Sequence, residues 1–281
     1  MLINWYPGHM EKARKQVKEV MPMVDVVIEV LDARLPYSST NPMIETLRGE
    51  KPTLKVLSKS DLADDSVTRA WLDFWREQRN TDALAITTQN VNIAKSIPQR
   101  VTALLPNQGR RPGPINALIL GIPNVGKSTL INTLVGRKVV NVGNEPAVTK
   151  AQKRIRVNDD FILIDTPGMT WPGSKDVMIN YRLATSGAIR DTALEYDDVG
   201  IFAMDYMLQR YPELVAKYFQ IKNLADNAFD AMAQVAKMRN CMQRGGADYM
   251  RAGELFVREL RAGKIGRASL EEPYVSYHQR D

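Results

Sequence analysis

Apolar residues along this 281-residue chain gather in short runs that alternate with stretches of helical spacing. Six runs predict β-strands, at residues 24–31, 53–57, 83–86, 115–120, 154–157 and 161–164. Helical patterns lie between them at 41–47, 66–79 and 129–134. This alternation favours an α/β fold with a doubly wound, mostly parallel sheet, in which ligands bind at the carboxyl ends of the strands.

The pattern changes in the last third of the chain. From residue 205 to residue 260 the apolar spacing is helical, and glycine pairs such as Gly245-Gly246 interrupt it. We therefore expect two domains: an α/β domain over residues 1–177 and a smaller all-helical domain over residues 178–281.

A glycine-rich segment, Gly121-Ile-Pro-Asn-Val-Gly-Lys-Ser128, follows the fourth predicted strand and precedes a helical pattern. The G-x-x-x-x-G-K-S spacing in this context is typical of a phosphate-binding loop, whose backbone N–H groups cradle phosphates at a helix N-terminus. It predicts that Lys127 neutralises β- and γ-phosphate oxygens and that the Ser128 hydroxyl ligates Mg²⁺. The predicted cradle comprises Asn124, Val125, Gly126, Lys127, Ser128 and Thr129.

Two later segments supply further groups for Mg²⁺ and a γ-phosphate. Asp165-Thr-Pro-Gly168 comes after the sixth predicted strand and matches the pattern D-x-x-G. In that pattern Asp165 holds Mg²⁺ through water, and the amide of Gly168 meets the γ-phosphate. Thr149, in the stretch between the loop and Asp165, is the candidate switch threonine, which ligates Mg²⁺ only when the γ-phosphate is present.

The segment Ser58-Lys-Ser-Asp61, after the second predicted strand, resembles the guanine-reading pattern N-K-x-D. Asp61 would accept hydrogen bonds from N1–H and the 2-amino group of guanine, a donor pair that adenine lacks. Ser58 replaces the usual asparagine, and we expect the shorter side chain to lose one hydrogen bond, either to the base or to the phosphate loop, at a cost of about 1–2 kcal/mol. The predicted base site comprises Ser58, Lys59, Ser60, Asp61, Thr87 and Thr88.

The order of these motifs is rotated along the chain. In most nucleotide-switch domains the phosphate loop opens the domain and the base-reading motif comes last, whereas here the base-reading motif comes first. The sequence therefore predicts a circularly permuted GTPase domain.

The amino-acid composition indicates which class of partner the protein binds. The net charge of +6 favours a polyanionic partner, and basic residues crowd the first helix and the surroundings of the phosphate loop. A solvated basic face is the alternative interpretation. The single cysteine excludes an intramolecular disulfide. We find neither a signal peptide nor an apolar run long enough for a membrane span, and we expect a cytoplasmic monomer.

The chain resembles, nearly end to end, the circularly permuted GTPases of the RbgA/YlqF type, that is, ribosome biogenesis GTPase A and its mitochondrial relatives. Besides the phosphate loop, the resemblance rests on Trp5-Tyr-Pro-Gly-His-Met-Glu-Lys-Ala13, Leu31-Asp-Ala-Arg-Leu-Pro-Tyr-Ser38, Thr185-Ser-Gly-Ala-Ile-Arg-Asp191, Gly245-Gly-Ala-Asp248 and Gly263-Lys-Ile-Gly266. It implies a GTPase that binds rRNA and assists a late step in assembly of the large (50S) ribosomal subunit, with hydrolysis stimulated by the ribosome.

The resemblance also implies residue roles. Met169 stands where many GTPases have a water-orienting glutamine, and His9 of the N-terminal motif is the family's proposed catalytic side chain, beside Lys127 and Thr149. The alternative for His9 is a structural role in the N-terminal turn. Asn124 resembles the asparagine that coordinates K⁺ in potassium-activated GTPases, or it stabilises the loop. Basic residues of the helical domain would form an RNA face, or they are the charges of ordinary solvated helices: Arg239, Arg244, Arg251, Arg258, Arg261, Lys264 and Arg267.

Two other functions stay open at this stage. One is a GTP-independent RNA-binding scaffold, in which the altered base-reading motif leaves nucleotide binding vestigial. The other is a GTPase that acts on a non-ribosomal RNA. Weak GTP affinity would favour the first, and the identity of copurifying RNA would test the second.

Overall fold

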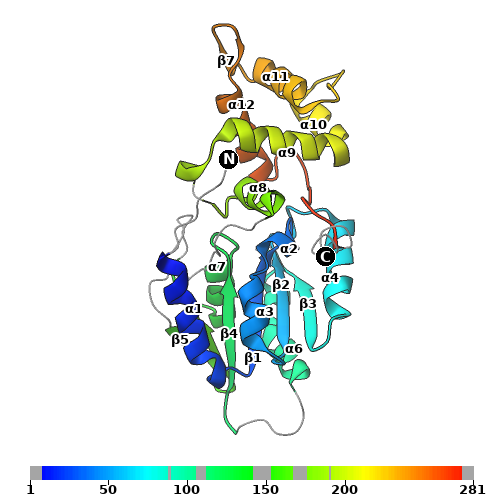
Figure 1. The fold of residues 1–281 in the computed structure, drawn as a ribbon. Helices are drawn as coiled ribbons and strands as arrows, with labels where there is room; N and C mark the ends of the chain where they lie inside the picture. Colours follow the sequence, from blue (N-terminus) through cyan, green and yellow to red (C-terminus); the bar gives the residue numbers. More distant parts are fainter. Residues whose placement is uncertain are drawn as a thin grey trace.

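The structure, a computed structural model, describes residues 8–87, 90–105, 112–141, 153–166, 176–189 and 191–273, with side chains from residue 14 onward. A sheet and its covering helices form one part, and a helical region is stacked on the end of that sheet (Figure 1).

The sheet has six strands in the order β3-β2-β1-β4-β6-β5. Their bounds are β1 Val26–Asp32, β2 Thr53–Ser58, β3 Thr81–Ala85, β4 Ile115–Gly121, β5 Lys153–Asn158 and β6 Phe161–Asp165. The pairs among β1, β2, β3, β4 and β6 are parallel, and β5 runs antiparallel to β6. The predicted strands and the mostly parallel sheet are thereby confirmed.

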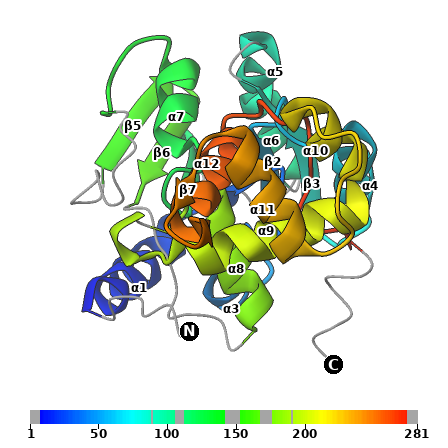
Figure 2. The same ribbon diagram turned by 90° about the horizontal axis from the view of Figure 1, so that it is seen from above.

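Helices cover both faces of the sheet. The helices of this part of the chain are α1 Gly8–Val20, α2 Pro36–Ser39, α3 Pro42–Arg48, α4 Asp65–Arg76, α5 Val91–Lys95, α6 Ile97–Leu104 and α7 Lys127–Val135, with a 3₁₀ turn at Met21–Met23. The two views place α1, α3 and α4 on one face and α6 and α7 on the other (Figures 1 and 2). On the first face, buried Lys55 of β2 pairs with Glu29 of β1 at 2.6 Å and lies 4.5 Å from the ring centre of Trp75 on α4.

The helical region comprises α8 Val177–Ser186, a 3₁₀ turn at Asp191–Ala193, α9 Tyr196–Arg210, α10 Pro212–Phe219, α11 Ala228–Met238 and α12 Tyr249–Arg261. Two glycines let α9 and α12 cross closely, because a Cβ built on Gly200 would lie 2.5 Å from the Cα of Gly253. The region is not helical throughout. Met242–Gln243 and Gly246–Ala247 pair as a short hairpin (β7, β8), whose turn uses Gly245 at φ +97°.

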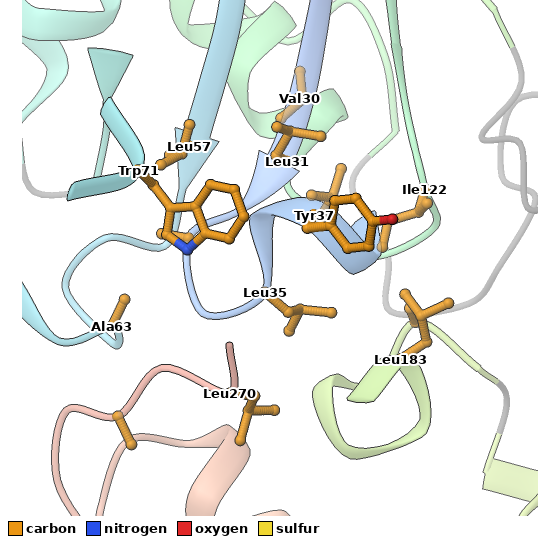
Figure 3. Close-up of a cluster of buried hydrophobic side chains, with 14 of the residues drawn as sticks. Val30, Leu31, Leu35, Tyr37, Leu57, Ala63, Trp71, Ile122, Leu183 and Leu270 are labelled. Atoms are coloured by element: carbon orange, nitrogen blue, oxygen red, sulfur yellow. The ribbon is translucent and has the colours of Figure 1, made fainter. Parts of the chain in front are cut away.

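One continuous core joins the sheet to the helical region. Leu35 and Tyr37, which follow β1, gather with Leu183 of α8 and Leu270 from the segment after α12 (Figure 3). All four side chains are buried. The chain thus returns to the sheet after leaving the helical region, and a division into domains at residue 177 remains a prediction. Among the described residues, none of the helices has the length and apolar character needed to cross a bilayer.

Candidate functional site

The carboxyl ends of four adjacent strands bring the sequence motifs together. Parallel pairing sets Asp32 of β1 opposite Ser58 of β2, and Val30 opposite Gly121 at the start of the phosphate loop. On the other side of β4, Ile119 lies opposite Asp165 of β6. The predicted base-reading, phosphate-binding and D-x-x-G motifs therefore begin at one edge of one sheet, where α/β proteins bind ligands.

The phosphate loop has the backbone that its glycines predict. A Cβ on Gly121 would lie 2.6 Å from the carbonyl oxygen of Val30, so the loop can leave the sheet here only with glycine. Asn124 and Gly126 adopt left-handed conformations with φ of 60° and 97°. Helix α7 begins at Lys127 without a side-chain cap. Its first N–H groups are therefore available to an anion, which the helix dipole also attracts.

Lys127 and Asp165 form a buried ion pair beside the start of α7. Burial raises the pKa of the Asp165 carboxyl, against the opposing charge of Lys127. The second carboxylate oxygen, Oδ2, is buried and has no hydrogen-bond partner within the described residues. Ser128 is half-buried next to this pair. A carboxylate oxygen without a partner and a neighbouring hydroxyl fit the oxygen ligands that Mg²⁺ prefers.

Ser58 connects the base-reading tetrad to the phosphate loop. Its hydroxyl lies 2.9 Å from the carbonyl of Leu31 and also within hydrogen-bond reach of the carbonyl of Val125. The hydrogen bond to the loop is therefore not lost, because the short side chain reaches the loop's backbone, and a lost hydrogen bond to the base remains a prediction. A Cβ on Gly126 would lie 3.8 Å from Ser58, which shows how closely the two segments approach.

The rest of the tetrad is tied to neighbouring segments. Lys59 has φ of 55°, and its ammonium lies 3.0 Å from a carboxylate oxygen of Asp32. Ser60 donates from its hydroxyl to the carbonyl of Ile86 at 3.1 Å, directly before half-buried Thr87. Asp61 is half-buried in the same loop.

Asp32 and Arg34 are functional candidates to which the sequence assigned no role. Both are buried, and the Arg34 guanidinium makes two hydrogen bonds to the Asp32 carboxylate, at 2.9 and 2.7 Å. Burial alone would raise the pKa of Asp32, but Arg34 and Lys59 outweigh it and hold that pKa well below its usual range. The sequence signal that could have identified them is Asp-x-Arg at the end of an apolar run, because the predicted motifs also follow the ends of such runs.

The helical region contacts the site at the end of α8. Asn124 of the phosphate loop donates to the carbonyl of Gly187 at 2.9 Å, and Arg34 donates to the carbonyl of Ser186 at 3.2 Å. Arg261 of α12 donates to the carbonyls of Thr185 and Ala184 at 3.0 and 2.7 Å. Carbonyls at a helix end lack intrahelical partners, so side chains from three segments satisfy them here.

This arrangement removes Arg261 from the expected RNA face, and the rest of that face remains a prediction. Arg261 is held by α8, and Arg267 binds the loop before α4 through the carbonyls of Ser60 and Ala63. The Arg261 side chain is 16% exposed and serves internal contacts, whereas the Arg267 side chain stays 44% exposed although its guanidinium binds these carbonyls. Arg244 and Arg251 are exposed, as the hypothesis requires.

Several predicted residues are not placed by the structure. Thr88, Thr149 and Gly168 lie outside the described residues, as does Met169. His9 belongs to α1, but its side chain is not described. Their roles remain predictions.

Comparison with known proteins finds relatives along almost the whole chain. A family model described as 50S ribosome-binding GTPase matches residues 116–236. Ribosome biogenesis GTPase A of Bacillus cereus is 42% identical over 281 aligned residues, which cover 97% of this chain and 95% of that protein. The protein of the same name from Thermotoga maritima is 32% identical, with 96% and 95% covered. Mitochondrial ribosome-associated GTPase 1 of Mus musculus is 30% identical, with 97% and 91% covered.

Two solved structures of YlqF align with this chain over most of its length. A GDP-bound YlqF structure aligns with a TM-score of 0.65 at 25% identity and covers 92% of this chain and 99% of its own. The GNP-bound YlqF of T. maritima aligns with a TM-score of 0.64 at 25% identity, with 94% and 99% covered. With the nucleotide motifs in rotated order at one sheet edge and relatives aligned over almost the whole length, this chain belongs to the ribosome biogenesis GTPase A family.

Proposed function

We propose that this protein binds and hydrolyses GTP and assists a late step in the assembly of the large ribosomal subunit, where it binds rRNA. The observation that carries the proposal is the buried Lys127–Asp165 pair beside the uncapped start of α7. A buried cation and a free helix N-terminus together form a site for a polyphosphate. The names of the relatives supply the ribosomal context.

Phosphate binding would break the ion pair between Lys127 and Asp165. The backbone from Asn124 to Thr129 receives the β- and γ-phosphates, and Lys127 turns from Asp165 to their oxygens. Ser128 and Asp165, together with Thr149, would hold Mg²⁺, which would neutralise charge on the phosphates. The amide of Gly168 meets the γ-phosphate.

Base selection would fall to Asp61, with Lys59 along the ring and Ser58, Ser60, Thr87 and Thr88 around it. Asp32 holds Lys59 at 3.0 Å and so fixes the direction of its stem. Since adenine lacks the N1–H and 2-amino donor pair, this carboxylate favours GTP over ATP.

His9 is the proposed group that positions the attacking water, because Met169 has no polar atom suited to that task. The His9→Ala variant should bind GTP normally and lose stimulated turnover. Normal turnover of that variant on the ribosome would remove His9 from the mechanism.

Asn124 is the proposed K⁺ ligand. Its amide nitrogen already donates to Gly187, which leaves the side-chain oxygen to face a cation. We expect faster turnover in K⁺ than in Na⁺ buffer, and equal rates would exclude this role.

We further propose that the protein binds a precursor of the large ribosomal subunit, that it is cytoplasmic and that it is a monomer. The net charge of +6 supports binding to RNA. A change at the γ-phosphate would reach the helical region through the Asn124–Gly187 contact, among others.

The deciding experiment measures GTP turnover by the full chain in potassium buffer, with and without large ribosomal subunits. We expect slow intrinsic turnover and strong stimulation by the subunits. The Lys127→Ala variant serves as the control without phosphate binding. Absence of turnover in both conditions would favour the GTP-independent scaffold, and stimulation by another RNA alone would favour a non-ribosomal substrate.

A further inference from the structure

The loop after the base-reading tetrad is held by a segment from the far end of the chain. After α12, residues 267–270 run alongside residues 60–65. The amide of Ala268 donates to the carbonyl of Leu62 at 3.1 Å. The amide of Asp64 donates to the hydroxyl of Ser269 at 3.2 Å. Leu270, which ends this stretch, is buried in the core shared with Ala63 (Figure 3).

Arg267 makes the most extensive contact between the two segments. Its guanidinium donates to the carbonyl of Ser60 at 2.8 Å and to the carbonyl of Ala63 at 2.8 Å. It also binds both carboxylate oxygens of Asp65 at 2.6 Å each. The planar fork of an arginine is suited to several acceptors at fixed angles, whereas a lysine offers a single point of charge. One side chain therefore spans the loop from Ser60 to Asp65.

Asp61 lies between the two carbonyls that Arg267 binds. On the other side of the loop, the amide and hydroxyl of Ser60 both donate to the carbonyl of Ile86, at 3.2 and 3.1 Å. The backbone around Asp61 is thus held both by Ile86, the residue after β3, and by the segment at residues 267–270.

The contact matters for geometry more than for stability. The side chains of Arg267 and Asp65 are 44% and 66% exposed, and an ion pair with such exposure contributes little to folding. The two carbonyl contacts, in contrast, determine where the backbone on either side of Asp61 lies. A carboxylate that accepts two hydrogen bonds from a flat base needs its direction set accurately.

We propose that Arg267 is a positioning residue for guanine selectivity, which holds the loop so that Asp61 faces both N1–H and the 2-amino group of the base. The inference rests on the proposed base-reading role of Asp61. Arg267 itself does not contact the nucleotide.

The experiment compares dissociation constants for GDP and for inosine diphosphate, whose base lacks the 2-amino group. The wild-type chain should bind GDP more tightly. In Arg267→Met, GDP affinity should fall about ten-fold, the effect of roughly one hydrogen bond, while inosine diphosphate affinity falls no more than about three-fold. The preference for GDP therefore shrinks. Arg267→Lys cannot span both carbonyls, and its preference for GDP should lie between that of the wild type and that of Arg267→Met.

The matched control is Arg79→Met, between α4 and β3, whose guanidinium pairs with Glu50 and whose side chain is 84% exposed. It should bind both nucleotides as the wild type does. Asp65→Ala is a second test, because it removes the carboxylate that orients Arg267 at an exposed position. Asp65→Ala should reduce the preference for GDP, and by less than Arg267→Met does.

An unchanged GDP preference in Arg267→Met and Asp65→Ala, or an equal loss of affinity for both nucleotides, would overturn the inference. Asp61→Asn in the same assay distinguishes a failure of the base-reading role of Asp61 from a failure of the positioning role of Arg267. If Asp61→Asn keeps the preference, the base-reading role itself fails. If it abolishes the preference while Arg267→Met keeps it, only the role of Arg267 fails.

Discussion

The hydroxyl of Ser58, at the end of β2, reaches the backbone carbonyl of Val125 in the phosphate loop. The same hydroxyl lies 2.9 Å from the carbonyl of Leu31 at the end of β1. One small side chain thereby connects the base-reading motif, the first strand and the phosphate loop. An asparagine is not required to link these segments, because the strands bring the loop's backbone within reach of a serine.

Ser58→Ala should lower both the stability of the protein and its affinity for GDP. The variant removes a buried hydroxyl that lies between the carbonyls of Leu31 and Val125, and the expected loss in unfolding free energy is about 1–2 kcal/mol. Urea denaturation of the nucleotide-free protein measures it. Ser66→Ala is the control, at an exposed serine whose hydroxyl donates to the carboxylate of Asp64 at 2.6 Å. Because that hydrogen bond is exposed to water, the change in stability should be less than about 0.5 kcal/mol. Equal stabilities of Ser58→Ala and wild type would contradict the role of this hydroxyl.

Lys127→Met should destabilise the nucleotide-free protein as well as abolish phosphate binding. The substitution leaves the Asp165 carboxylate buried without its cation, which typically costs about 3–5 kcal/mol. The double variant Lys127→Met/Asp165→Asn should recover part of that loss, because a neutral amide is cheaper to bury. Urea denaturation of the two single variants and the double variant checks the coupling. Additive effects would show that the two groups do not form the pair in solution.

The stability contributed by Asp32 should depend on pH. Its pKa in the folded protein is held below the unfolded value of about 3.9 by Arg34 and Lys59, against the effect of burial. A carboxyl with a lowered pKa contributes stability above its unfolded pKa and loses it as the pH falls through the folded one.

Asp32→Asn tests this dependence. The difference in unfolding free energy between wild type and Asp32→Asn should be largest near neutral pH and should shrink below about pH 4. Glu271, whose pKa is raised by burial, contributes in the opposite direction, but it is present in both proteins and cancels in the difference. A difference that is constant from neutral to acid pH would disprove the assignment.

Gly253→Ala should loosen the crossing of α9 and α12. A Cβ at this position would lie 2.1 Å from the carbonyl oxygen of Tyr196, and backbone atoms cannot yield as a flexible side chain can. We expect a loss of about 1–3 kcal/mol in unfolding free energy, as is usual for an overpacked core. Glu254→Ala, on the half-exposed side of the same helix, should change stability by no more than about 0.5 kcal/mol. Thermal and urea unfolding of both variants decide the matter.

Much of the site could be predicted from the sequence because it depends on short-range chemistry. The strand that ends at Gly121, the loop, and the helix that begins at Lys127 lie within a few residues of one another. Asp165 ends another apolar run, as predicted. The hairpin at Met242–Gln243 and Gly246–Ala247 was not predicted, because strands of two residues give no periodic signal.

Pairs that join distant segments could not be predicted in this way. Glu29 and Lys55 each interrupt an apolar strand, and only the parallel register of β1 and β2 sets them opposite each other and makes their burial possible. Asp32 and Lys59 meet for the same reason. The sequence shows both charges of each pair, but it does not show which strands are neighbours.

The sequence by itself determined the class of sheet, the order of the motifs and the kind of nucleotide site, because apolar periodicity and motif spacing are local properties of the chain. Only the tertiary structure decided what the arginines of the helical region do. Arg261 and Arg267 have the spacing of solvated helix or loop residues, yet they bind backbone carbonyls of Ala184 and Ser60. Every residue carries such a carbonyl, so an acceptor of this kind leaves no mark in the sequence, and the fold alone selects it.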